Sequence, residues 1–149
     1  MVWKPNVTVA AVVERDGRFL LVEERADGAL VLNQPAGHLD EGESLLNAVV
    51  RETLEETAWH IEPQALLGVY RWCHPVKRIT YLRFAFIARP LREERNGTLD
   101  EGIVRALWLA PSEIRREQHR HRSPQVQRCI DDYLAGQRHP LSILKDLSY

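Results

Sequence analysis

The stretch Gly37-His38-Leu39-Asp40-Glu41-Gly42-Glu43 leads towards Val50-Arg51-Glu52-Thr53-Leu54-Glu55-Glu56-Thr57-Ala58-Trp59, and these two segments together decide the fold. A glycine-containing loop precedes a helical segment that we expect to begin near Glu43 or Ser44. Because a helix turns by about 100° per residue, Glu52, Glu55 and Glu56 share one flank of it. The other side carries residues suited to packing, namely Leu46, Val49, Val50, Thr53 and Thr57.

Three carboxylates at this spacing repel one another unless a cation lies between them. Carboxylate oxygens are the ligands that hard divalent cations prefer. The alternative interpretation is an exposed acidic helix face, which is common on globular proteins. The glutamates therefore indicate a metal site only if further residues of the stretch support that interpretation.

The same stretch resembles the signature box of the Nudix hydrolases, which reads Gly, five residues, Glu, seven residues, Arg-Glu-apolar-x-Glu-Glu-x-Gly-apolar. The matching positions are Gly37, Glu43, Arg51, Glu52, Glu55, Glu56 and Trp59. Two positions depart from the pattern, because Thr53 replaces an aliphatic residue and Ala58 replaces the closing glycine. Thr53 still offers a methyl group for packing, whereas Ala58 is unusual if the helix ends there in a left-handed conformation. Neither departure removes a carboxylate, so the resemblance favours the functional interpretation.

Stretches outside the box resemble the branch of Nudix hydrolases that contains the NudJ phosphatase. They are Val7-Thr8-Val9-Ala10, Asn33-Gln34-Pro35-Ala36-Gly37-His38-Leu39, Leu82-Arg83-Phe84, Arg122-Ser123-Pro124 and the segment 133–141. The resemblance implies one Nudix domain over residues 1–149, built as an α/β/α sandwich with a mixed β-sheet and the box as a loop-helix-loop. It also implies hydrolysis of small pyrophosphates, among them nucleotides and a pyrimidine pyrophosphate of the thiamine pathway.

Hydrophobic patterning predicts an α/β fold with a mixed sheet around the box helix. Strands are predicted over 7–13, 19–22, 65–73, 79–88 and 103–109, with a short strand and loop over 30–37, a polar loop over 92–101, and helices that start at Pro111 and at Ser123-Pro124. Asp16-Gly17 predicts a hairpin between the first two strands. Alternation in the segment 79–88 gives an apolar face with Phe84 and Phe86, so we expect Arg83 to point away from that face.

The composition suits one ordinary domain. The chain has 149 residues, of which 44% are apolar, and a formal net charge of −1. We therefore expect neither a nucleic-acid nor a membrane partner, and no apolar run approaches membrane-spanning length. Cys73 and Cys129 are too few for a disulfide framework, and the N-terminus lacks the apolar core of a signal peptide. We expect a cytoplasmic protein, monomeric or homodimeric, with a small nucleotide or pyrophosphate as its partner.

The chemistry of a diphosphate explains why clustered glutamates are needed. An attacking water is repelled by the phosphate charges unless a metal ion neutralises them and lowers the pKa of the water. We expect Mg²⁺, with Mn²⁺ able to replace it, held by Glu52, Glu55 and Glu56. The resemblance adds the backbone carbonyl of Gly37 as a further ligand.

The general base is left open between Glu52 and an acidic residue on a distant loop, either Asp100 or Glu101. The resemblance points to these two places without choosing between them. Arg51 and Glu43 are expected to pair and to hold the helix against its loop, a role that suits the planar guanidinium group.

Basic and aromatic side chains outside the box are candidates for substrate contacts. For phosphate groups they are Arg83, Arg78, Lys77 and Arg122, and for stacking on a base or pyrimidine ring they are Tyr70 and Trp72. The alternative for Arg83 is a solvated strand face, and the alternative for both aromatic residues is core packing. The run 115–122 is a further candidate for contact with a polyphosphate or RNA, but most of it is expected to be a solvated surface, with Arg122 as the exception.

The leading hypothesis is a Mg²⁺-dependent hydrolase of nucleoside di- and triphosphates or of a related small pyrophosphate. ADP-ribose and dinucleoside polyphosphates are alternative substrates. Pro75 stands about where the ADP-ribose branch carries a proline, but its neighbours Cys73-His74 differ from that branch. A non-catalytic Nudix-fold module that only binds a ligand is the rival from another class, and the intact glutamates argue against it.

Overall fold

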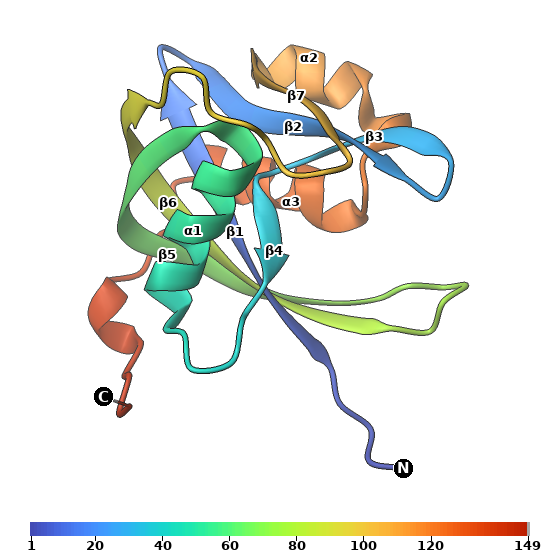
Figure 1. Ribbon diagram of the computed structural model, residues 1–149, viewed down its shortest axis with the longest axis vertical. Coiled ribbons are helices and arrows are strands. Elements are labelled where there is room, and N and C mark those ends of the chain that lie inside the picture. Colours follow the sequence, from blue (N-terminus) through green and yellow to red (C-terminus); the bar gives the residue numbers. More distant parts are fainter. Residues whose placement is uncertain (149) are drawn as a thin grey trace.

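The computed structural model describes residues 1–148, which form a mixed β-sheet covered by helices (Figure 1). Along the chain the elements are β1 (Asn6–Arg15), β2 (Arg18–Ala26), β3 (Ala29–Asn33), β4 (Ala36–His38), α1 (Leu45–Thr57), β5 (Trp59–Cys73), β6 (Thr80–Glu93), β7 (Ile103–Leu109), α2 (Pro111–Arg116), the 3₁₀ turn η1 (Gln118–Arg120), α3 (Pro124–Leu134) and the 3₁₀ turn η2 (Leu141–Ile143).

The strand β1 is the centre of the sheet. The order of the main path is β3-β2-β1-β6-β5, with β4 paired to β1 and β7 paired to β2. The pairing of β1 with β6 is parallel, and the other pairings are antiparallel. The predicted mixed sheet is therefore confirmed.

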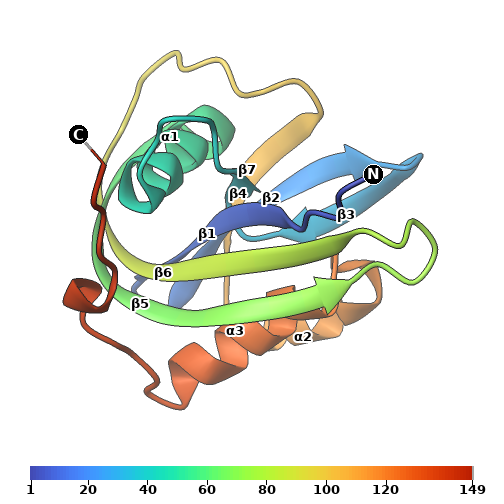
Figure 2. The same cartoon turned by 90° about the horizontal axis from the view of Figure 1, so that it is seen from below.

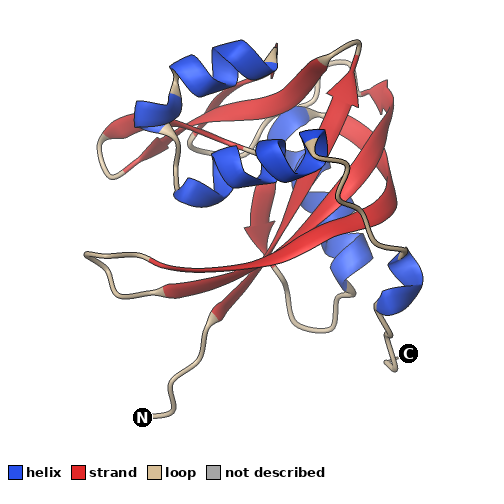
Figure 3. Ribbon diagram, turned by 180° about the vertical axis from the view of Figure 1, so that it is seen from behind, coloured by secondary structure: helices blue, strands red, loops and turns tan. Residues whose placement is uncertain are grey.

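Helices cover both faces of the sheet, as the α/β/α prediction requires. Figure 2 shows α1 on one side and α2 and α3 on the other, and Figure 3 shows the face covered by α2 and α3. In β6, Phe86 packs in the cluster that includes residues of α1, whereas Ala85 and Ile87 pack in the cluster that includes residues of α3. The predicted apolar face is therefore present, but the opposite face of β6 is buried as well at Ala85 and Ile87. No helix among residues 1–148 has the length and apolar character needed to cross a bilayer.

Two tight hairpins flank β2. Asp16 and Gly17 have φ values of 52° and 77°, which is the conformation of a two-residue type I′ turn and confirms the predicted hairpin. Asp27 and Gly28 form a second turn of the same kind between β2 and β3, with φ values of 52° and 79°. The predicted end of β2 at residue 22 is wrong, because the charged segment 23–26 continues the strand to this second turn.

The strands β5 and β6 are longer than the pattern predicted. The strand β5 begins at Trp59, not at residue 65, and β6 continues to Glu93 into the predicted polar loop. Register shifts on both sides of Pro63 interrupt the pairing with β6. Such bulges let a sheet-edge strand contain a proline, which weakens the sequence signal for a strand.

The helix α1 begins and ends where the sequence predicts. The Oγ atom of Ser44 accepts a hydrogen bond from the backbone N–H of Asn47 at 3.1 Å and caps the first turn. Ala58 ends the helix with φ 65° and ψ 13°, so it adopts the left-handed conformation expected of the missing glycine. Thr53 is buried, and its hydroxyl donates to the carbonyl of Val49 at 2.8 Å.

Candidate active site

The box helix and the loop that joins β6 to β7 bring three carboxylates together. Glu52 and Glu55 of α1 and Asp100 of this loop each offer an oxygen, and these atoms lie within 4.8 Å of one another. The loop passes over the C-terminal end of α1 (Figure 1). The backbone N–H of Asp100 donates to the carbonyl of Glu55 at 3.0 Å, which fixes the position of Asp100 beside the helix. Asp100, which was predicted only as a candidate general base, thus lies next to the predicted metal ligands Glu52 and Glu55.

Glu56 lies outside this group of three, but Glu52 and Glu56 line one cleft. It is only 8% exposed, and one of its oxygens accepts a hydrogen bond from the backbone N–H of Ala36 at 2.9 Å. Burial raises the pKa of Glu56 to about 8, and burial also raises the pKa of Glu52. Charging these carboxyl groups together is therefore costly unless a cation is close to them.

Gly37 makes room for the carboxylate of Glu52. A Cβ atom on Gly37 would overlap the carboxyl carbon and both oxygens of Glu52. The backbone of β4, which contains Gly37, is therefore in direct contact with the acidic end of that side chain. Gly37, whose carbonyl the resemblance gives as a further metal ligand, thus lies beside the carboxylate of Glu52.

Arg51 joins the loop that precedes α1 to the acidic group, which is the cluster of Glu52, Glu55 and Asp100. Its guanidinium donates twice to Glu43, from Nε at 2.7 Å and from Nη2 at 2.9 Å, and Nη1 donates to Glu52 at 2.8 Å and to Glu55 at 3.1 Å. Nη2 also donates to the carbonyl of His38 at 3.1 Å. The hydrogen bond from Arg51 holds the pKa of Glu43 below its usual range, and the hydrogen bond to Glu43 raises the pKa of Arg51. The predicted Arg51–Glu43 pair is present, and the same guanidinium also partly neutralises the acidic group.

A cleft of about 380 Å³ connects the box with the hairpins β2–β3 and β5–β6. Its lining includes acidic, basic and aromatic side chains. The lining residues include Glu24, Asp27, Asn33, Gly37, Glu52, Glu56, Trp72, His74, Lys77, Tyr81, Arg83 and Arg122.

Three aromatic rings lie side by side on the β5–β6 hairpin. Trp72 and Tyr81 face each other across the two strands with ring centroids 5.9 Å apart and planes 19° apart. His74 lies 5.3 Å from Trp72 with a tilt of 56°. Because all three residues line the cleft, they form an aromatic wall on which a flat ring can stack. Trp72 was predicted for this place, whereas Tyr81 and His74 were missed.

Arg83 is buried, so the alternative of a solvated strand face is wrong. It is 4% exposed and lines the cleft. Its Nη1 donates to Oε1 of Gln34 at 2.8 Å, and its Nη2 donates to Oδ1 of Asn33 at 2.9 Å. The sequence placed Arg83 on the correct face of β6, but it gave no sign that α3 covers that face.

Most of the run 115–122 is exposed, as predicted, but two of its arginines pair with glutamates of β2. Arg122 donates to Glu24 at 2.6 Å and lines the cleft, while Arg120 pairs with the buried Glu23 at 2.8 Å. Both glutamates come from β2, whose side chains could not be placed without knowledge of the strand pairing. Glu24 was missed as a cleft residue for that reason.

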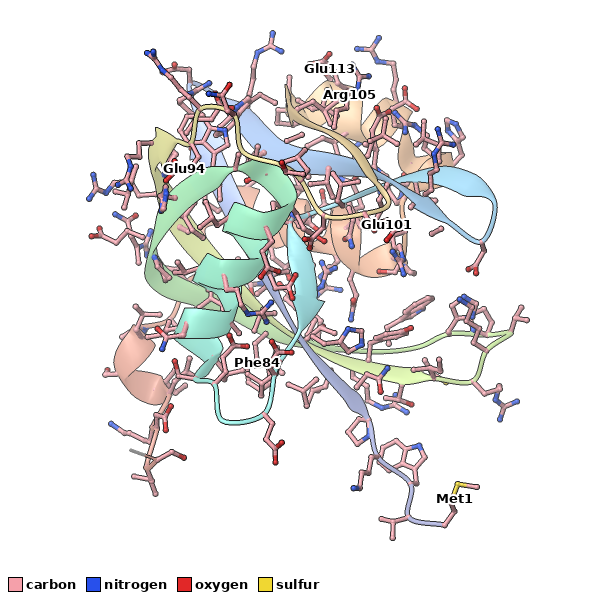
Figure 4. All side chains as sticks on the ribbon, in the orientation of Figure 1. Met1, Phe84, Glu94, Glu101, Arg105 and Glu113 are labelled. Carbon is pink, nitrogen blue, oxygen red and sulfur yellow. The ribbon has the colours of Figure 1, made fainter. Side chains whose placement is uncertain are left out.

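Three predicted site residues belong neither to the cleft nor to the network of Glu43, Arg51, Glu52, Glu55 and Asp100. Tyr70 does not line it and donates its hydroxyl to Asp132 at 2.7 Å. Arg78 is exposed at the tip of the β5–β6 hairpin, where its neighbour Lys77 reaches the cleft instead. Glu101 is exposed where the loop leads into β7 (Figure 4), and the group formed by Glu52, Glu55 and Asp100 does not include it.

Comparisons with known proteins agree on one family. A model of the NUDIX domain matches residues 3–129. The phosphatase NudJ of Shigella boydii serotype 4 (strain Sb227) is 38% identical over 147 residues, which cover 99% of this chain and 95% of that protein. The phosphatase NudJ of Escherichia coli (strain K12) has the same identity and coverage. A solved NUDIX hydrolase from Nitrosomonas europaea is 51% identical, with a TM-score of 0.93 over 96% of this chain and 97% of that one.

Proposed function

This chain belongs to the Nudix hydrolases, and from that premise we propose that it hydrolyses the diphosphate linkage of nucleoside di- or triphosphates, or of a related small pyrophosphate, with bound Mg²⁺. One observation carries the proposal. A single cleft is lined by the carboxylates Glu52 and Glu56, by the buried cation Arg83 and by the aromatic residues Trp72 and Tyr81. These are the groups that a diphosphate attached to a flat ring requires.

The donor set fits a hard divalent cation. Glu52, Glu55 and Asp100 offer oxygens close together, and Glu56 and the carbonyl of Gly37 are the further ligands that we propose. When bound, Mg²⁺ or Mn²⁺ supplies charge neutralisation at the phosphate oxygens and a lowered pKa of the attacking water. Burial raises the pKa of Glu52 and of Glu56, so a cation beside these carboxyl groups would lower the electrostatic cost of ionising them.

The proton of the attacking water is taken by a carboxylate of the acidic group. Glu52 and Asp100 are the two candidates that we retain, since both belong to this group, whereas Glu101 is exposed outside it. If Asp100 is the base, Glu52 is chiefly a ligand. If Glu52 is the base, it combines both roles.

Arg51 and Glu43 position the acidic group. The paired hydrogen bonds between them hold the guanidinium in one orientation, from which Nη1 reaches both Glu52 and Glu55. We propose that this arrangement keeps the two carboxylates in place before the ion binds. Lysine cannot replace Arg51 here, because it lacks the planar fork.

The remainder of the cleft binds the rest of the substrate. Trp72, with Tyr81 and His74 beside it, stacks on a base or pyrimidine ring. Arg83, Lys77 and Arg122 contribute positive charge for phosphate groups. Tyr70 and Arg78 do not line this cleft, so we give them no direct contact with the ring or the phosphates.

A phosphate-release assay tests the proposal. We expect Mg²⁺-dependent turnover with at least one member of a panel of nucleoside di- and triphosphates, a pyrimidine pyrophosphate, ADP-ribose and dinucleoside polyphosphates, with the products identified. Glu55→Gln and Glu56→Gln are expected to lower kcat by about 100-fold or more while the fold stays intact, because each removes a ligand charge. Glu41→Gln, the same chemical change at an exposed position of the loop that precedes α1, is the control.

The outcomes separate the rival functions. Turnover restricted to ADP-ribose or to dinucleoside polyphosphates would move the protein to those alternatives. Ligand binding without product from any substrate would support the non-catalytic module and refute the enzyme proposal. Wild-type rates in both glutamate variants would show that these carboxylates hold no catalytic ion.

A further inference from the structure

Arg83 is a buried cation without a counterion. Its recorded partners are the amide oxygens of Gln34 and Asn33 and, at 3.8 Å from Nη1, the sulfur of Cys129. Its Nε has no hydrogen-bond partner, and none of the ion pairs within residues 1–148 involves it. Every recorded polar contact of the guanidinium is therefore with a side-chain amide or with a thiol.

The thiol of Cys129 does not neutralise Arg83. Cys129 is completely buried, and burial raises the pKa of its thiol, so the sulfur remains protonated at neutral pH. The four acidic residues that line the cleft have other partners. Glu24 pairs with Arg122, Asp27 with Lys77 and Glu52 with Arg51, and Glu56 accepts a hydrogen bond from the backbone N–H of Ala36.

Gln34 is fixed in the orientation that Arg83 needs. Its side chain is completely buried, and its Nε2 donates to the carbonyl of Val126 at 2.8 Å. A flip of the amide would direct an N–H group at the guanidinium and an oxygen at that carbonyl. Its Oε1 therefore has one stable place, against Nη1 of Arg83.

An uncompensated buried charge costs several kcal/mol even after the protein relaxes around it. Two amide oxygens reduce this cost, but they do not cancel the charge. A carboxylate in place of either amide would neutralise the arginine with almost no change in shape. The chain instead holds the guanidinium with neutral groups beside a cleft, which leaves its charge available to an anion that enters the cleft.

We propose that Asn33 and Gln34 are positioning residues that keep Arg83 as an uncompensated cation for one phosphate group of the substrate. This inference rests on the proposed function and adds an anion site that is separate from the carboxylates proposed to hold the metal ion. A guanidinium matches a phosphate because two parallel N–H groups can donate to two of its oxygens. The substrate class is therefore one in which a phosphate, not only a ring, reaches Arg83.

Asn33→Asp tests the proposal because it adds a counterion and little else. The Nδ2 of Asn33 donates no hydrogen bond to any part of the chain that the structure describes, so the change removes none. The probe is inorganic pyrophosphate, titrated calorimetrically with Mg²⁺ and separately with EDTA. We expect the Kd of pyrophosphate to rise about tenfold or more, since charge-assisted hydrogen bonds to Arg83 are lost, while Tm is kept or raised.

The control is Gln64→Glu, which makes the same chemical change at an exposed position of β5 and is expected to leave the Kd unchanged. Arg83→Lys keeps the charge without the fork and is expected to bind pyrophosphate more weakly than the wild type; this second variant decides the matter if Asn33→Asp does not fold. For a substrate that is turned over, Asn33→Asp should raise KM far more than it lowers kcat.

Several outcomes overturn the inference. The first is that the wild type does not bind pyrophosphate, either with Mg²⁺ or with EDTA. The second is an unchanged Kd of pyrophosphate in Asn33→Asp or, if that variant does not fold, in Arg83→Lys. The third is that the variant keeps its affinity for pyrophosphate but loses affinity for an uncharged nucleoside, which would assign Arg83 to the ring. Because the titration in EDTA measures pyrophosphate binding without turnover, it remains informative if no substrate is hydrolysed. The failure of the proposed function and the failure of this inference are thereby distinguished.

Discussion

At Gly37, the lack of a side chain allows the carboxylate of Glu52 to lie against the backbone of β4. We expect Gly37→Ala to push that carboxylate aside and to lower kcat by about 10- to 100-fold, since a shift of about 1 Å in a catalytic group has an effect of this size. The group that must move is the end of a flexible side chain, so Tm should change by only a few degrees. Steady-state kinetics and thermal unfolding of the same preparation measure both effects.

A double-mutant cycle checks the cause. If Gly37→Ala acts by displacing Glu52, then adding Glu52→Gln should cost much less than Glu52→Gln costs alone. Additive losses would mean that the alanine acts through another part of the site.

The sequence predicted the acidic residues because their relation is local. Glu52, Glu55 and Glu56 are placed by helical spacing alone, and the paired Arg51 and Glu43 belong to the same motif. The environment of Arg83 was not predictable in this way. Its burial depends on the packing of α3 against β6, and its partners come from β3 and the segment that follows it, far away in sequence.

At the scale of one element, the end of α1 depends on Ala58. A residue with a side chain at φ 65° is strained by about 1–2 kcal/mol, whereas glycine is not. Against this, Ala58→Gly removes a buried methyl group worth about 0.8 kcal/mol. We therefore expect the free energy of unfolding to stay unchanged or to rise by up to about 1 kcal/mol, measured by urea denaturation. A clear loss would mean that packing of this methyl group outweighs the backbone strain.

The strand β2 depends on a buried carboxylate that it shares with its neighbours. Glu23 has a 6% exposed side chain and pairs with Arg105 of β7 and Arg120 of η1. Glu23→Gln leaves both guanidinium groups without this charge, and we expect a loss of about 1–3 kcal/mol at pH 7. Glu62→Gln is the control, since Glu62 and its partner Arg89 are both exposed and should contribute less than about 0.5 kcal/mol.

The effect of Glu23→Gln should depend on pH. The hydrogen bond from Arg105 holds the pKa of Glu23 below its usual range. A carboxyl group with a lowered folded pKa contributes stability that is complete above the ordinary value of about 4.3 and is lost as the pH falls through the folded pKa. The difference between wild type and variant should therefore shrink on acidification, in denaturation curves compared at neutral and acid pH. An equal difference at both pH values would contradict a role for the charge.

The full length of the strands β2 and β5 could not be predicted from the sequence pattern. The first part of β5 contains Pro63 and several register shifts, so neither alternation nor propensity indicates a strand there. The charged segment 23–26 of β2 resembles a surface loop until Arg105, Arg120 and Arg122 are placed around it. Element boundaries that depend on such distant pairs require the structure.

At the scale of the whole molecule, the two hairpins that border the cleft are joined at their tips. Lys77 of the turn between β5 and β6 lies 2.9 Å from Asp27 of the turn between β2 and β3, and both residues line the cleft. Their side chains are 43% and 66% exposed, so this ion pair contributes little to stability. It does, however, reduce the positive charge that an incoming anion meets.

Asp27→Asn should therefore change binding and not stability. Asparagine tolerates the left-handed conformation at this position, so the turn is kept. With Lys77 released, we expect KM for an anionic substrate to fall about 2- to 5-fold at low ionic strength, with the difference disappearing as salt is added. Asp16→Asn is a matched control, because Asp16 has the same φ of 52° in a turn of the same kind but does not line the cleft. An equal fall in KM for both variants would indicate a general effect of net charge, and a rise in KM for Asp27→Asn would show that Asp27 holds Lys77 in its binding position.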